Sequence, residues 1–215
     1  MFKKWSDEWG NPCFWNPGSN RSCGVAILFN SESFKNAKLI KQGAGRFQVY
    51  EIIDSEFSLP IRLVNVYAPN SGEDRKKFYI DLKILLNSID EEAFHLIGGD
   101  HNCALNSILD RKNCRQMDGD AGNVEINQLI SEINLEDIWR RREPEAFEYT
   151  CKSGERMSGI DYWLFSDALD NKSQIQYLNP SWSDHRAVRL DISCEETKMG
   201  PGLWKMNKEV IKTDT

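Results

Sequence analysis

The sequence predicts an α/β fold in which mainly antiparallel sheets are covered by helices. Short apolar or alternating segments bounded by turn residues recur along the chain, as expected for strands. Two longer segments carry apolar residues every three to four positions, as expected for helices. Neighbouring strands joined by tight turns and interrupted by helices favour a pair of sheets with the helices outside.

The first half of the chain contains a predicted strand–helix–strand unit. Residues 4–20 are rich in Trp, Pro, Gly and Asn, and we expect irregular structure there. A helix is predicted over residues 71–87, with Phe78, Leu82 and Leu86 on its apolar stripe. Gly98 and Gly99 are expected to end the last strand of this half, because glycines favour turns. The predicted strands cover residues 24–29, 46–53, 61–67 and 94–97.

The second half combines one predicted helix with several short strands. Residues 103–122 form a long polar stretch, and a helix follows over 123–133 with Asn123 as its expected N-cap. We place one domain over residues 1–195 and a polar linker over 196–215. The predicted strands cover residues 147–151, 160–165, 173–178 and 187–192.

Composition and charge narrow the classes of function. The chain has 215 residues, 28% of them charged, and a formal net charge of −6. This acidity argues against a non-specific nucleic-acid coat, yet it is compatible with an enzyme whose acidic site lies inside a basic rim. Candidate rim residues are Arg111, Lys112 and Arg140 to Arg142.

Cysteine usage and hydropathy indicate an intracellular protein. The six cysteines are scattered, without a CxxC pair or a histidine at zinc spacing, so we expect reduced thiols. The chain shows neither a signal-peptide pattern nor an apolar run of the roughly 18–20 residues that a membrane span needs. We therefore expect no membrane association, and a location in the nucleus or cytoplasm.

Polar side chains suited to catalysis follow or precede four predicted strands. Carboxylates can hold Mg²⁺ or Mn²⁺, and a histidine beside a carboxylate can donate to a phosphate oxygen. If the four turns converge, the set suits phosphodiester hydrolysis. The alternatives are ordinary polar turns and, for the Asp184–His185 pair, a local hydrogen bond. The candidates are Tyr67, Asn70, Asp100, Asn102, Asp161, Asp184 and His185.

Four motifs in order resemble the signature motifs of the endonuclease/exonuclease/phosphatase superfamily, whose members are DNase I-like. They are most similar to the endonuclease domain of LINE-type (non-LTR) retrotransposons, and residues 200–207 resemble the segment that leads toward a reverse transcriptase. The resemblance implies a four-layer sandwich, two mixed sheets flanked by helices, in a monomeric domain that acts on DNA. The motifs are residues 64–70, 98–102, 158–162 and 183–188.

The resemblance implies a role for each candidate residue. Tyr67 would contact the scissile phosphate and Asn70 would help to build its pocket. Asp100 would activate the water that Asn102 orients. In the remaining turns, Asp161 would hold the imidazole of His185, His185 would bind the phosphate, and Asp184 would serve the Mg²⁺ or Mn²⁺ ion.

The sequence departs from the family pattern at three places. His101 stands where Phe is usual, and we expect it to pack as an aromatic ring. Gly159 stands where Arg is common. The family's first strands, with their metal-binding Glu, are expected to precede Met1, and Glu8 is in the wrong context to replace that Glu.

The function predicted from the sequence is therefore Mg²⁺-dependent DNA nicking, in a chain that is N-terminally truncated and inactive if the upstream Glu is essential. One alternative is a catalytically dead remnant or a domain co-opted for binding. A second alternative is a phosphatase of the same superfamily.

Overall fold

The computed structural model describes residues 2–18, 23–54, 57–89, 91–114 and 121–192. Its centre is a six-stranded mixed sheet with the order β3-β4-β5-β6-β11-β8. Strands β5 and β6 are parallel and every other pair in this sheet is antiparallel. The six strands are β3 (Lys38–Gly43), β4 (Phe47–Ile52), β5 (Ile61–Tyr67), β6 (Phe94–Asp100), β8 (Leu135–Asp137) and β11 (Asp161–Ser166).

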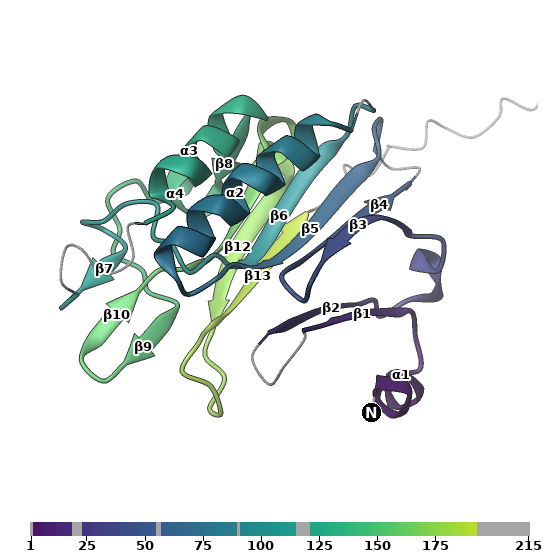
Figure 1. Cartoon of the computed structure of the whole chain (residues 1–215), viewed down its shortest axis with the longest axis horizontal. Helices are drawn as coiled ribbons and strands as arrows, with labels where there is room; N and C mark the ends of the chain where they lie inside the picture. Colours follow the sequence, from purple (N-terminus) through teal and green to yellow (C-terminus); the bar gives the residue numbers. More distant parts are fainter. Residues whose placement is uncertain (1, 19–22, 55–56, 90, 115–120, 193–215) are drawn as a thin grey trace, which may run out of the picture.

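Helices α2 (Gly72–Asn87) and α3 (Asn123–Glu132) cover one face of this sheet (Figure 1). Phe78 and Leu82 of α2 join Ile126 of α3 and Val64 of β5 in one buried cluster. The apolar stripe read from the sequence therefore faces the sheet, and its burial supplies most of the stability of such a helix. A short helix, α4 (Ile138–Arg142), follows β8.

Two two-stranded sheets pack on the opposite face. The pair β1 (Cys13–Pro17) and β2 (Gly24–Leu28) packs through Ile27 against Tyr50 of β4. The pair β12 (Ser173–Leu178) and β13 (Ala187–Ile192) packs near Phe165 of β11. The central sheet thus has helices on one side and strands on the other, as predicted.

The remaining elements are short. A three-stranded sheet of order β7-β10-β9 lies in the chain segments that precede α3 and β11. No helix in the described part of the chain has the length and apolarity needed to cross a bilayer. The predicted linker over 196–215 lies outside the described residues. The short elements are β7 (Arg111–Lys112), β9 (Cys151–Ser153), β10 (Arg156–Ser158), η1 (Glu32–Phe34) and η2 (Asp167–Lys172).

The prediction of irregular structure over residues 4–20 was wrong. The segment forms helix α1 (Phe2–Trp9) and strand β1. The ring of Trp5 lies 5.6 Å from that of Trp15, and Trp9 Nε1 donates to the Phe29 carbonyl at 2.6 Å. These contacts join residues far apart in sequence, so local composition did not reveal them.

The prediction that Gly98 and Gly99 end their strand was also wrong. Strand β6 continues through both glycines to Asp100. A Cβ on Gly98 would lie 2.4 Å from the Trp163 ring, and Gly99 has φ +138° with its Cβ position 2.0 Å from the Val66 carbonyl oxygen. The glycines therefore allow close approach of neighbouring strands rather than a turn.

Several boundaries differ from the prediction. Helix α3 begins at Asn123, so its N-cap is Gly122, while Asn123 Nδ2 donates to the carbonyls of Ala104 and Leu105. Residues 135–139 form β8 and the start of α4, and only Cys151 of the predicted strand 147–151 lies in a strand. Strands β3, β7, β8 and β10 were not predicted, because such short or polar segments depend on their sheet partners.

Candidate active site

Three predicted site residues lie side by side at one end of the central sheet. Asp100, the last residue of β6, is the register partner of Tyr67 at the end of β5. It is also the register partner of Asp161, the first residue of β11. The sheet register therefore brings together residues 67, 100 and 161, which the sequence alone could only place at separate strand ends.

A short hydrogen-bonded chain connects Asp100 to the turn after β5. The Asn102 backbone N–H donates to Asp100 Oδ1 at 2.9 Å, and Asn102 has φ +48°, a left-handed conformation that asparagine tolerates. Asn102 Nδ2 donates to Asn70 Oδ1 at 3.0 Å and to the Ala68 carbonyl at 2.8 Å. The amide group of Asn102 thus holds the Asn70 turn against the end of β6.

The imidazole of His185 is held by Asp161. His185 Nδ1 lies 2.9 Å from Asp161 Oδ2, and the two side chains are 33% and 15% exposed. The buried Thr150 orients this pair, since its Oγ1 accepts from the backbone N–H of Asp161 at 2.9 Å and its carbonyl accepts from the N–H of Arg186 at 2.6 Å. Thr150 is therefore a positioning residue for both loops.

The electrostatics of the site set opposite charges on Asp100 and His185 at neutral pH. Burial, followed by the neighbouring Asp161 carboxylate, raises the pKa of Asp100 to about 6. The hydrogen bond to Asp161 raises the pKa of His185 to about 9. Asp100 is then a carboxylate near its own pKa, suited to accept a proton, and His185 is an imidazolium.

Two groups of side chains in the described part of the chain could hold a metal ion. In the first group, ligand atoms of Asp100, Asp161 and His185 lie within 4.8 Å of one another. In the second, ligand atoms of Cys151, Asp184 and His185 do so. Asp184, the predicted metal ligand, is exposed and belongs to the second group, so its carboxylate lies beside a thiol.

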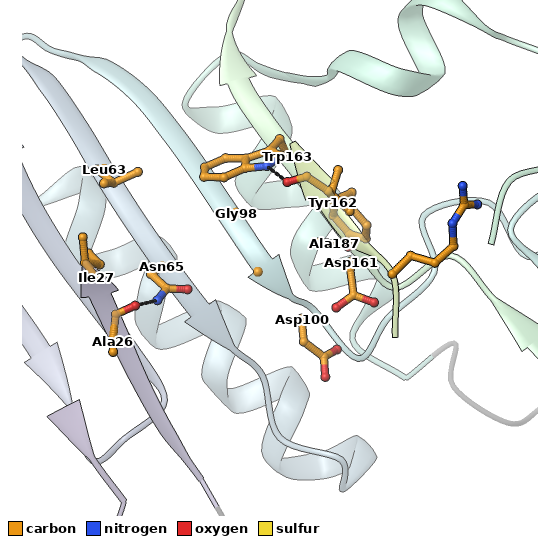
Figure 2. Close-up of a pocket in the computed structure, with 13 residues that line it drawn as sticks. Ala26, Ile27, Leu63, Asn65, Gly98, Asp100, Asp161, Tyr162, Trp163 and Ala187 are labelled. Atoms are coloured by element: carbon orange, nitrogen blue, oxygen red, sulfur yellow. Dashed lines mark hydrogen bonds between the residues drawn. The ribbon is translucent and has the colours of Figure 1, made fainter. Parts of the chain in front are cut away.

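A cavity of about 360 Å³ opens beside Asp100 and Asp161, between β2 and β13 (Figure 2). Its floor contains Gly98 and Trp163 of the central sheet. Asn65 Nδ2 donates to the Ala26 carbonyl at 2.9 Å on one side, and Trp163 Nε1 donates to the Val188 carbonyl at 3.0 Å on the other. The two acids therefore face a concave space that an extended polymer could approach.

His101 and the expected basic rim have structural roles. His101 is fully buried and stacks on Tyr162 at 4.0 Å, and burial lowers its pKa to about 3, so it packs as a neutral aromatic ring as predicted. Arg140 pairs with Asp110, and Arg141 pairs with Glu136 and Asp167. These two arginines of the expected rim are therefore engaged in ion pairs with acidic side chains.

The sequence did not reveal three residues that shape the site. Thr150 is described above. Arg75 is 3% exposed and donates to the carbonyls of Pro69 and Asn70, which fixes the turn that carries Asn70. The Cys151 thiol lies among acids, and burial together with Asp161, Asp184 and Asp100 raises its pKa to about 11. The one local signal was the position of Thr150 and Cys151 just before a predicted turn.

Comparisons with known proteins support the fold. No family model matches the chain. It is 28% identical over 215 residues to a transposon TX1 uncharacterized 149 kDa protein of Xenopus laevis, and it spans 16% of that protein's length. The match to this transposon protein covers 98% of the chain.

Solved nuclease structures share the fold. An AP endonuclease of Leishmania major superposes with a TM-score of 0.68 at 20% identity, covering 84% of this chain and 70% of that one. An AP endonuclease of Archaeoglobus fulgidus gives 0.68 at 16% identity, over 84% and 78% of the two chains. A 3′-5′ exonuclease of Neisseria meningitidis gives 0.67 at 18%, over 84% and 79%. The DNase I-like α/β fold is thereby confirmed, and the sequence is similar to that of a transposon protein, in line with the resemblance.

Proposed function

We propose that this chain is the DNA-nicking endonuclease domain of a transposon-type protein and hydrolyses phosphodiester bonds with a divalent cation. The observation that carries the proposal is the register of Tyr67, Asp100 and Asp161, with His185 bound to Asp161. In support, Asp100 and Asp161 line the cavity between β2 and β13, and His185 is hydrogen-bonded to Asp161. The likeness to nucleases supports phosphodiesters as the substrate class.

Each residue of the site has its own role in the proposed reaction. Asp100 takes a proton from the attacking water as the new oxygen–phosphorus bond forms, and Asn102 orients that water through its amide group. His185, held as imidazolium by Asp161, donates to a phosphate oxygen and stabilises the charge that develops there. Tyr67 and Asn70 contact the phosphate on which the leaving oxygen–phosphorus bond breaks.

The donor set fits a hard divalent cation. Asp100 and Asp161 lie close together, and burial, followed by the Asp161 carboxylate, raises the pKa of Asp100. Oxygen ligands of this kind suit Mg²⁺ or Mn²⁺. Asp100 and Asp161, whose ligand atoms lie within 4.8 Å of each other, would hold the ion, which when bound would stabilise charge on the phosphate and the leaving group.

The extent of the domain is part of this proposal. In the described residues, β2 pairs only with β1 and β13 only with β12, and the cavity lies between β2 and β13. Both strand pairs pack on the central sheet, so we infer a single domain over residues 1–195. A protein that nicks chromosomal DNA would act in the nucleus.

A plasmid-nicking assay tests the function. Supercoiled plasmid and an abasic-site duplex are incubated with Mg²⁺ and either this chain or a version extended upstream. We expect nicking that Asp100→Ala abolishes and that Asp81→Asn, a change at an exposed helical acid, leaves intact. Full-rate nicking by Asp100→Ala would refute the role of Asp100, and a protein that binds DNA without nicking would favour a domain co-opted for binding.

A further inference from the structure

A second set of metal donors lies next to the proposed catalytic histidine. Ligand atoms of Cys151, Asp184 and His185 lie within 4.8 Å of one another. In the part of the chain that the structure describes, Cys151 is the one cysteine that belongs to such a group. The proposed reaction assigns no role to this thiol.

The backbone fixes these three residues beside one another. Cys151 and His185 form an isolated antiparallel bridge, and the Lys152 N–H donates to the Asp184 carbonyl at 2.9 Å. On the other side of the bridge, the Arg186 N–H donates to the Thr150 carbonyl at 2.6 Å. The paired chain segments therefore hold the three residues at neighbouring positions.

The donor types select a different ion from the one proposed above. Mg²⁺ prefers oxygen ligands, whereas Zn²⁺ takes thiolate, imidazole and carboxylate together. Zinc bonds of about 2.0–2.3 Å in a tetrahedron place donor atoms roughly 3.3–3.7 Å apart. Side chains with ligand atoms within 4.8 Å reach that spacing by small rotations, and a neighbouring cavity of about 380 Å³ leaves room for a fourth, water ligand.

The Asp161–His185 hydrogen bond adds an independent indication. Histidines that bind zinc usually donate their other ring N–H to a carboxylate, which fixes the ring and strengthens the ligand. Here His185 Nδ1 lies 2.9 Å from Asp161 Oδ2, which leaves Nε2 as the nitrogen available for a metal. The ring is thus already oriented in the manner of a zinc ligand.

We propose that Cys151, Asp184 and His185 form a binding site for a thiophilic divalent cation such as Zn²⁺, and that the bound ion inhibits phosphodiester hydrolysis by engaging His185 and Asp184. The binding part of this inference stands on the donor geometry alone. The inhibitory part rests on the proposed nuclease function. Because Zn²⁺ binds a thiolate and a neutral imidazole, its binding releases protons and strengthens as the pH rises.

Cobalt substitution tests the binding part without any activity. Co²⁺ added to the metal-free chain is expected to give a thiolate-to-cobalt charge-transfer band that saturates at a single equivalent and disappears when Zn²⁺ is added. Cys151→Ser should abolish the band, and Asp184→Ala should weaken Co²⁺ binding at least about tenfold. Cys114→Ser is the matched control, since Cys114 is also a partly buried free thiol but lies in neither donor group.

Two outcomes of the cobalt titration would contradict the proposed metal site. An unchanged band in Cys151→Ser, or a band lost in Cys114→Ser, would overturn the site. Circular dichroism of each variant establishes that the protein is folded before the titration.

Nicking assays test the inhibitory part. With Mg²⁺ in excess, Zn²⁺ should stop plasmid nicking by the unmodified chain and by Cys114→Ser, and should act at least about tenfold more weakly on Cys151→Ser. Equal inhibition of Cys151→Ser would overturn the inhibitory role. If neither the unmodified chain nor any variant nicks plasmid in the absence of Zn²⁺, the proposed nuclease function and the proposed inhibition are both refuted. The cobalt spectra would still decide whether the metal site exists.

Discussion

Two rows of residues cross the central sheet at its opposite ends. Both rows include β5 and β6, and they differ in how their acids are paired with cations. At one end, Glu51, Arg62 and His95 are register partners on β4, β5 and β6. Arg62 is 1% exposed and lies 3.8 Å from Glu51 Oε2 and 3.2 Å from His95 Nε2. Burial, followed by the nearby Arg62 charge, lowers the pKa of His95 to about 4. Lys38 of β3 extends this row as the register partner of Glu51, with its Nζ 3.9 Å from Glu51 Oε1. The one acid of the row therefore lies between two cations.

The row at the other end contains Tyr67, Asp100 and Asp161, and here the acids exceed the cations. His185 pairs with Asp161, yet the pKa of Asp100 stays raised to about 6. An end that only stabilised the fold would gain from paired charges, as the Arg62 row does. Unbalanced acids that face a cavity are therefore better explained by binding of a cation and by proton transfer.

The largest expected effect comes from removing the proton acceptor of the acidic row. Asp100→Asn should lower the nicking rate by roughly 10²–10⁴-fold, because general-base catalysis contributes about this much. The free energy of unfolding should stay the same or rise, since the variant removes a partly buried charge near a like charge. Initial nicking rates at equal folded concentration, together with urea unfolding curves, measure both quantities. A parallel loss of stability would indicate a structural role instead.

Removing Arg62 from its row should lower the stability of the protein without lowering its nicking activity. Arg62→Met removes the buried partner of the Glu51 carboxylate and leaves it only the exposed Lys38, which should lower the free energy of unfolding by about 3–5 kcal/mol. Nicking per folded molecule should be unchanged below the unfolding transition. The double variant Arg62→Met/Glu51→Gln should recover part of the stability. Loss of activity in the folded single variant would contradict the separation of the two ends.

Removing the acid that holds His185 should change the pH dependence of nicking. The pKa of His185 is raised to about 9, so the imidazolium and the activity that needs it are present at neutral pH and are lost as the pH rises through about 9. Asp161→Asn should move this alkaline limb toward the ordinary histidine value near 6.5 and lower the rate at neutral pH by about 10–100-fold. An alkaline limb that stays in place would mean that another group titrates there.

The smallest expected effect on nicking comes from changing an acid that lies outside both rows. Asp137 caps α4 through bonds from the Trp139 and Arg140 N–H groups, and burial raises its pKa to about 6. Because this pKa lies above the unfolded value near 3.8, the folded state binds the extra proton, and its contribution to stability is lost as the pH rises from about 4 to about 6. Asp137→Asn, which keeps a capping side chain, should remove a decrease of about 3 kcal/mol in the free energy of unfolding and leave nicking unchanged. Thermal unfolding at the two pH values measures it.

Local patterns predicted the parts of this molecule that depend on local physics. The apolar stripe of residues 71–87 gave α2 within one residue, since one buried face determines such a helix. Strand 61–67 has the predicted bounds. Asp100 and Asn102 were identified because carboxylate and amide groups follow an apolar strand. Their side chains lie close together because the two residues are only two positions apart in the sequence.

The remainder depends on partners that are distant in sequence. Gly98 and Gly99 resemble turn residues until Trp163 and Val66 are seen to lie against them. Arg75, in the first turn of a helix, resembles a solvated charge until three carbonyls of the turns beside Asn70 and Ala121 accept its hydrogen bonds. Thr150 acts through backbone groups of another strand, which no spacing in the sequence could indicate.

Calorimetric titration with Mg²⁺ tests the contrast between the two rows most directly. The unmodified chain and Arg62→Met should bind Mg²⁺ saturably with similar affinity, whereas Asp100→Asn should bind it at least about tenfold more weakly. Absence of saturable binding in the unmodified chain, or equal affinity in Asp100→Asn, would contradict the assignment of the acidic row as a cation-dependent catalytic site.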